Sequence, residues 1–142
     1  MSNFTFEPTN IAEVLLVTAR RHGDDRGDFM ETYEREAFRQ GGILAEFMQD
    51  NQSMSKRRGT IRGLHFQAGP AAQAKFVRVM QGAIFDVAVD LRQDSQTYGH
   101  WCGAELSSDN GCALFVPRGF AHGFCTLADD TIVAYKVDAP YS

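Results

Sequence analysis

Short apolar runs separated by glycines and polar turns recur along the chain from residue 60 to residue 137. Many of these runs alternate apolar with polar positions or are rich in β-branched and aromatic residues, which favours strands over helices. We expect strands at residues 60–65, 75–80, 83–91, 100–106, 113–116, 123–127 and 131–137. Short strands at such regular spacing, with turns between them, are typical of a sandwich or barrel, so the pattern predicts an all-β fold.

The first 58 residues carry a weaker pattern. We expect a strand at 14–18, a possible short strand at 29–33, an extended segment at 43–48 and a polar loop at 50–58. The one plausible helix covers residues 34–40, where two glycines supply a C-terminal stop. Gln81-Gly82, between two strong strands, is a hairpin signal. No repeat or linker divides the sequence, so we expect one domain over residues 1–142.

The strand predicted at 83–91 has an informative alternation. One face carries only apolar residues, and the other carries Ile84, Asp86, Ala88 and Asp90. A face with two carboxylates between apolar neighbours either meets solvent, which is the more common case, or lines a polar cavity. The cavity interpretation requires other polar side chains to point to the same place.

Candidates for such a cavity are His65, His122 and Lys75, each close to the end of an apolar strand. Imidazole has an ordinary pKa near neutrality, so two histidines beside a fixed cation suit proton transfer. Lys75 shares its strand face with two valines, and a lysine facing inward is costly unless it is paired or functional. The alternative is that the histidines are ordinary hydrogen-bonded residues of a barrel.

Composition narrows the classes of function. The net charge of −4 and the pI near 5.5 argue against a nucleic-acid-binding protein. The basic run at 56–58 is either a solvated loop or a clamp for a phosphate-bearing ligand. Three cysteines without CxxC spacing suggest free thiols. With neither a signal peptide nor a membrane-spanning run visible, we expect a cytoplasmic protein without a membrane partner.

Longer motifs resemble one known family, that of the dTDP-4-dehydrorhamnose 3,5-epimerases among the cupins. The resemblance extends from about residue 10 to the end of the chain, and its motifs occur in the family's order. They lie at residues 25–31, 49–51, 62–67, 73–75, 82–92, 95–101 and 116–124.

The resemblance implies a cupin-type jelly roll, that is, a double-stranded β-helix barrel, with an N-terminal strand extension and one short helix. It also implies an isomerase that inverts C3 and C5 of a dTDP-4-keto-6-deoxyhexose, by proton abstraction next to the C4 ketone, in rhamnose-type deoxysugar biosynthesis. No cofactor is expected. Residues 117–122 fit half of a metal-binding cupin signature, but Gln67 stands where the other half needs a histidine, so we expect no metal.

By the same resemblance His65 is the base, Lys75 stabilises the enolate oxygen, and Tyr135 is the acid that returns a proton to the opposite face. Further residues match positions that contact the nucleotide or the sugar. These are Arg26, Phe29, Glu31, Gln49, Asn51, Arg62, Asp86, His122 and Tyr141. The resemblance implies a homodimer, with part of the nucleotide site supplied across the interface.

Family members continue beyond the position of Ser142 and include there an aspartate that pairs with the catalytic histidine. The sequence has no counterpart of it, so the chain is a fragment, a short homologue, or a protein in which Asp86 or Asp90 substitutes. Gln52 also replaces a histidine usual in the family. Alternatives are a single-centre epimerase, a 3,4-ketoisomerase on a dTDP-sugar, and a nucleotide-sugar-binding cupin with impaired turnover.

Overall fold

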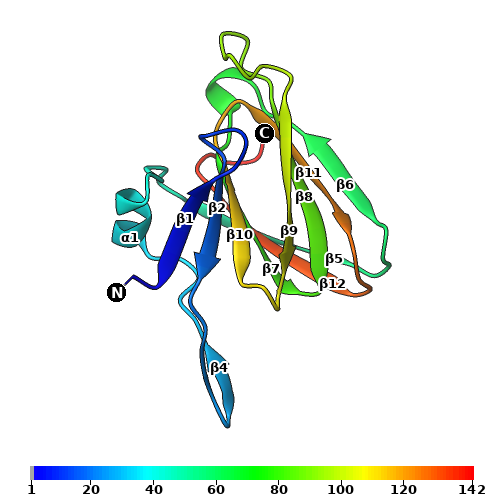
Figure 1. Ribbon diagram of the computed structural model, residues 1–142. Coiled ribbons are helices and arrows are strands. Elements are labelled where there is room, and N and C mark those ends of the chain that lie inside the picture. The colour runs from blue at the N-terminus through cyan, green and yellow to red at the C-terminus, as the bar shows by residue number, and fades with distance from the viewer. Residues whose placement is uncertain (1) are drawn as a thin grey trace.

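Two antiparallel sheets face each other in the computed structural model, which describes residues 2–142 (Figure 1). The larger sheet has six strands, in the order β1 (Phe4–Pro8), β2 (Leu15–Ala19), β10 (Cys112–Val116), β7 (Lys75–Gln81), β12 (Thr131–Val137) and β5 (Gln49–Ser55). The smaller sheet has four, in the order β6 (Ile61–His65), β11 (Phe120–Thr126), β8 (Ala83–Asp90) and β9 (Trp101–Ser107). The expected all-β, cupin-type jelly roll with one short helix is confirmed.

The main core lies between the sheets. β7 contributes Val77 and Val79, and β10 contributes Leu114, while Ile84 and Leu106 face them from the smaller sheet. Because apolar residues alternate with other residues along these strands, each strand directs one face into the barrel.

The six-stranded sheet is buried on its outer face as well. The short helix α1 (Arg35–Gln40) begins at Glu34, whose side chain accepts hydrogen bonds from the backbone N–H groups of Glu36 and Ala37. It places Phe38 in a cluster of aromatic rings, with centroids 5.0 Å from Phe4 and 4.9 Å from Phe76. This second core fixes the segment between the N-terminal strands and β5.

The carboxylate-bearing face of β8 points into the barrel. Ile84, Asp86, Ala88 and Asp90 are all buried, whereas Phe85 on the other face is exposed. This face of β8 therefore lines the interior of the barrel and does not meet solvent. Buried carboxylates need polar partners, and these are His122 for Asp86 and Arg92 for Asp90.

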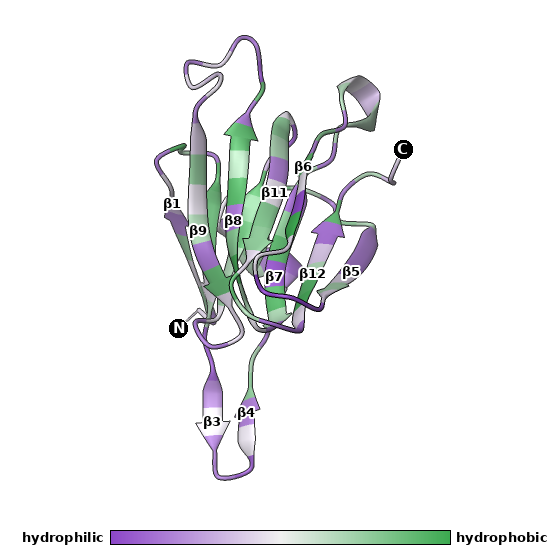
Figure 2. Cartoon of the chain, turned by 90° about the vertical axis from the view of Figure 1, so that its right-hand side faces the viewer, coloured by the Kyte–Doolittle hydropathy of each residue, from purple (hydrophilic) through white to green (hydrophobic). Residues whose placement is uncertain are grey.

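A polar hairpin projects from the barrel between β2 and α1. Its strands are β3 (His22–Asp24) and β4 (Gly27–Phe29), and it extends away from the end of the barrel where the C-terminus lies (Figure 2). The possible strand at 29–33 is wrong, since β4 ends at Phe29 and the following residues have no regular structure until α1. Figure 2 shows the hairpin as mainly hydrophilic, so its exposure carries little hydrophobic cost.

Three other local expectations need correction. The polar loop expected at 50–58 is largely a strand, β5, which pairs with β12 along its whole length. Residues 43–48 form no strand, and a 3₁₀ turn, η1 (Gly69–Ala71), precedes β7. Gln81-Gly82 is a corner and not a hairpin, because β7 and β8 belong to different sheets.

Within residues 2–142 no helix is long and apolar enough to cross a membrane. The three cysteines Cys102, Cys112 and Cys125 are free thiols, as expected.

Candidate active site

His65 lies at the end of β6, on the open edge of the smaller sheet. β6 pairs antiparallel with β11, and the register sets His65 opposite His122. The two strands approach closely at Gly63, where a Cβ atom would lie 2.7 Å from Cα of Gly123. Gly63 also has a φ of +113°, which L side chains rarely adopt. This glycine therefore lets β6 bring His65 to the mouth of the barrel.

Lys75 and Tyr135 approach the same mouth from the larger sheet. Tyr135 on β12 is paired with Val77 on β7, two residues after Lys75. The Lys75 Nζ atom lies 5.7 Å from the centroid of the Tyr135 ring. Burial lowers the pKa of Lys75, while the Asp86 carboxylate acts in the opposite direction. Lys75 thus faces inward with the valines of its strand.

His122 and Asp86 form a buried pair behind this cleft. The His122 Nε2 atom donates to Oδ1 of Asp86 at 2.6 Å. The second carboxylate oxygen, Oδ2, is buried and has no hydrogen-bond partner among the described residues. Asp86 is therefore committed to His122 through one oxygen and has a free acceptor on the other.

One cleft of about 380 Å³ unites several of the predicted site residues. His65 lines it from the smaller sheet, and Lys75, Tyr135 and Asn51 line it from the larger sheet. Tyr141 in the C-terminal segment also lines it. The structure thus brings the three residues expected to be catalytic to a single cavity.

The surroundings of His65 favour its neutral form. Its pKa is lowered first by burial and then by the positive charge of Lys75, with smaller contributions from His122 and Arg62. Among the described residues no carboxylate forms an ion pair or hydrogen bond with His65. Neither proposed substitute holds it, because Asp86 is paired with His122 and Asp90 with Arg92.

The other expected contact residues are not all at the cleft. Arg62 donates through Nε to Ser55 Oγ and through Nη2 to the carbonyl oxygen of Met54, both at 2.9 Å, which ties β6 to β5. Gln49 donates to the side-chain oxygen of Asn51 at 2.9 Å and so orients a residue that lines the cleft.

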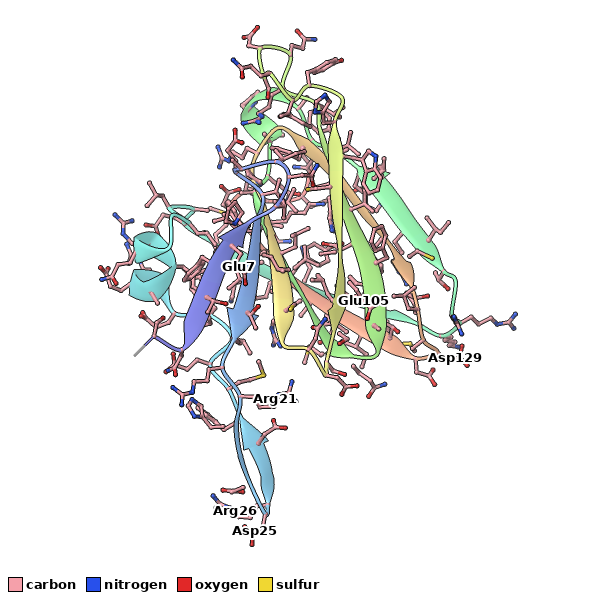
Figure 3. The ribbon with its side chains drawn as sticks, viewed as in Figure 1. Glu7, Arg21, Asp25, Arg26, Glu105 and Asp129 are labelled. Atoms are coloured by element: carbon pink, nitrogen blue, oxygen red, sulfur yellow. The ribbon has the colours of Figure 1, made fainter. Side chains whose placement is uncertain are left out.

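Arg26, Phe29 and Glu31 belong to the projecting hairpin and the segment that follows it. Arg26 lies at the hairpin tip, far from the barrel (Figure 3), and pairs with Asp24 at 2.8 Å. The hairpin and the C-terminal residues that line the cleft lie at opposite ends of the molecule. Within one chain, these three residues do not reach the cleft.

Six residues that line the cleft were not among the expected site residues: Leu64, Phe66, Gln67, Gln73, Phe120 and Ser142. Phe120 could have been found from strand periodicity, because it lies two residues before His122 and so shares its inward face. Among residues 2–142 no three histidine, cysteine, aspartate or glutamate side chains converge as metal ligands. The metal-free site stays a prediction.

Comparison with known proteins agrees with this geometry along nearly the whole chain. The family model described as dTDP-4-dehydrorhamnose 3,5-epimerase matches residues 8–142. The chain belongs to this family. A dTDP-4-dehydrorhamnose 3,5-epimerase from Sinorhizobium fredii is 54% identical over 137 residues, which cover 96% of this chain and 70% of that protein.

Solved structures of the dTDP-4-dehydrorhamnose 3,5-epimerase family share the fold closely. The Bacillus anthracis enzyme, with TDP and PPi bound, superposes with a TM-score of 0.95 at 53% identity, covering 98% of this chain and 79% of that one. The Legionella pneumophila RmlC, in complex with dTDP-4-keto-L-rhamnose, gives 0.93 at 39% identity, covering 98% and 73%. The family fixes the fold, while the roles of individual side chains remain predictions.

Proposed function

We propose that the protein is a dTDP-4-dehydrorhamnose 3,5-epimerase, which inverts C3 and C5 of a dTDP-4-keto-6-deoxyhexose in dTDP-rhamnose biosynthesis. The observation that carries the proposal is the placement of His65 and Tyr135 on opposite sheets of one cleft, with Lys75 beside Tyr135. The family's bound nucleotide and nucleotide sugar, in the Bacillus and Legionella structures, support the substrate class.

The chemistry needs a base and an acid on different faces of the sugar. Both C3 and C5 are next to the C4 ketone, so removing either proton gives an enolate. His65, neutral at physiological pH because its pKa is lowered, takes the proton from carbon. Lys75 places an ammonium group at the developing oxyanion.

Tyr135 then completes the inversion by donating its phenolic proton to the carbon from the other face. Each inversion leaves His65 protonated and Tyr135 deprotonated, so proton exchange with solvent must restore both groups before the second centre reacts. A proton returned from the His65 side would regenerate the starting configuration. The opposite placement of the two groups is therefore the feature that epimerisation requires.

The proposal includes a homodimer. Arg26, Phe29 and Glu31 match nucleotide-contacting positions of the family but lie on or next to a hairpin remote from the cleft of their own chain. A second copy of the chain can present its hairpin to this cleft. We also infer that residues 1–142 form one cupin domain, because both cores pack on the two faces of the same six-stranded sheet.

The test is to incubate the protein with dTDP-4-keto-6-deoxyglucose in deuterated water and to follow C3 and C5 by NMR. We expect deuterium and inversion at both carbons. Exchange at one carbon would instead indicate a single-centre epimerase, and transfer of the ketone to C3 a 3,4-ketoisomerase. Binding of dTDP without exchange would overturn the enzymatic proposal and leave a nucleotide-sugar-binding protein.

A further inference from the structure

The cleft has one buried apolar wall. Among its apolar lining residues, Phe120 is 5% exposed, whereas Leu64 is 58% and Phe66 is 45% exposed. The side chains nearest the chemistry, His65, Lys75 and Tyr135, are polar or bear a polar end. A small apolar substituent that enters the cleft therefore finds its desolvated surface at Phe120.

A guanidinium group lies over the Phe120 ring. The Cζ atom of Arg92 is 4.8 Å from the ring centroid, a cation–π arrangement. Gly119 makes room for it, because a Cβ atom there would lie 2.5 Å from Cγ of Arg92, and its φ is +92°. The stem of Arg92 thus packs directly against the loop that leads into β11.

Two carboxylates hold this guanidinium in place. Buried Asp90 accepts from Nε at 3.0 Å and from Nη2 at 2.9 Å, and Glu13 accepts from Nη1 at 2.8 Å. Asp90 is further fixed by the hydroxyl groups of Ser95, at 2.7 Å, and Thr97, at 2.5 Å. Because the planar group is held at both edges, its face has one orientation over the ring.

We propose that Phe120 determines specificity for a methyl group at C6 of the sugar, and that Arg92 is the positioning residue that fixes the Phe120 ring. The inference rests on the proposed function, in which C5 reacts at His65. C6 is bonded to C5 and must lie close to the reacting carbon. Phe120 lies two residues before His122 on β11, and His122 is paired with His65.

A hydroxymethyl group in the same place meets a penalty. Its hydroxyl would be buried against the Phe120 ring, which itself offers no hydrogen-bond partner. An apolar pocket rejects an added hydroxyl only moderately, by roughly 10- to 100-fold. Phe120 therefore supplies a preference for 6-deoxy sugars of that order.

The test compares the affinities of dTDP-6-deoxyglucose and dTDP-glucose by titration calorimetry. We expect the wild type to prefer the 6-deoxy sugar by about 10-fold or more. Phe120→Tyr, which adds a polar group to the ring, and Phe120→Leu, which opens space for water, should each reduce the ratio at least about threefold. Arg92→Lys keeps the charge but loses the planar contact, so it should reduce the ratio while leaving the affinity for dTDP alone unchanged.

Arg118→Lys is the matched control, because Arg118 lies one residue before Gly119 and pairs with Asp138 at 3.0 Å without covering a ring. A wild-type ratio near one, or folded Phe120 and Arg92 variants with the wild-type ratio, would overturn the inference. The affinity ratio does not depend on turnover. Absence of exchange at C3 and C5 in the wild type would count against the proposed function alone.

Discussion

At the scale of single residues, positively charged groups surround His65. Three basic side chains, Lys75, His122 and Arg62, act on its pKa in the same direction as burial. A general base must be unprotonated, so a lowered pKa extends activity to more acidic pH. The acid limb of kcat/KM should therefore lie below the ordinary histidine pKa of about 6.5.

Replacing Lys75 by Met should raise the pKa of His65. The change removes the largest of the charges that oppose protonation, while burial continues to lower the pKa. Titration of the His65 ring signals by NMR measures it directly. Arg58→Met is the control, since Arg58 does not contribute to the lowered pKa of His65. An unchanged His65 pKa in Lys75→Met would mean that the ammonium does not act on this imidazole.

Tyr135→Phe should separate proton abstraction from inversion. His65 still removes the proton, but the acid on the opposite face is gone, so deuterium returns from the His65 side with retention of configuration. Inversion should fall by about 10²-fold or more, the usual contribution of a general acid. His65→Ala should abolish both exchange and inversion, and both variants should bind dTDP nearly as well as the wild type. Undiminished inversion in Tyr135→Phe would assign the acid elsewhere.

At the scale of elements, the sequence predicts strands well where they pack in the core and poorly where they line the site. β8 was recognisable because its apolar residues alternate, yet its inward carboxylates could not be assigned to a cavity without the register of β11. β5 was missed because both of its faces are mainly polar. Its inward residue Asn51 lines the cleft and is polar. The apolar alternation by which a strand is recognised in a sequence is therefore absent here.

The close approach of β6 and β11 gives a prediction for Gly63. Gly63→Ala should destabilise the protein through a strained φ and through contact of the new Cβ with the backbone of Gly123. Gly59→Ala is matched, because Gly59 has a φ of +84° but open space around it. We expect a loss of about 1 kcal/mol for Gly59→Ala and about 1 to 3 kcal/mol more for Gly63→Ala. Equal losses in the free energy of unfolding, measured in urea, would show that the contact between β6 and β11 adds no cost at Gly63.

The loop after β8 gives a prediction about pH. Hydrogen bonds from Arg92 hold the pKa of Asp90 far below its usual range. The ionised carboxylate thus stabilises the fold fully above the unfolded aspartate pKa of about 3.9, and this contribution is lost as pH falls below it. Asp90→Asn should cost about 3 kcal/mol at pH 7.

Urea unfolding between pH 7 and pH 3 measures the difference between wild type and Asp90→Asn. The gap should stay constant down to about pH 4 and narrow below it. Asp24→Asn is the control, since Asp24 forms an exposed pair with Arg26 and its loss should leave the free energy of unfolding nearly unchanged. A gap that widens below pH 4 would reverse the assignment of Asp90 as the ionised partner.

At the scale of the whole molecule, the residues expected at the site are divided between the barrel and the hairpin. The family resemblance located both sets of residues, but neither pattern nor composition could show that they lie at opposite ends of the molecule (Figure 1). The strands of the hairpin are exposed and bury no apolar face, so no hydrophobic pattern in the sequence indicates where the hairpin lies. Under the proposed function, a nucleotide site that includes these hairpin residues needs a second copy of the chain.

Mixing two variants with defects in different parts of the proposed site tests this arrangement. His65→Ala destroys the cleft of its own chain but retains its hairpin, and Arg26→Ala weakens the hairpin but retains the cleft. A heterodimer of the two contains one site with an intact cleft and an intact hairpin. Random exchange of subunits should restore about a quarter of wild-type inversion, because half of the dimers are mixed and each has one good site.

The matched control mixes His65→Ala with Tyr135→Phe. Both changes affect the cleft, so a mixed dimer contains no intact cleft, and activity should not return. If His65→Ala and Arg26→Ala also fail to complement after complete subunit exchange, the hairpin contributes either to the site of its own chain or to no site at all. Since the hairpin tip lies far from the cleft of its own chain, restored activity in this one mixture requires that Arg26 acts on the partner's substrate.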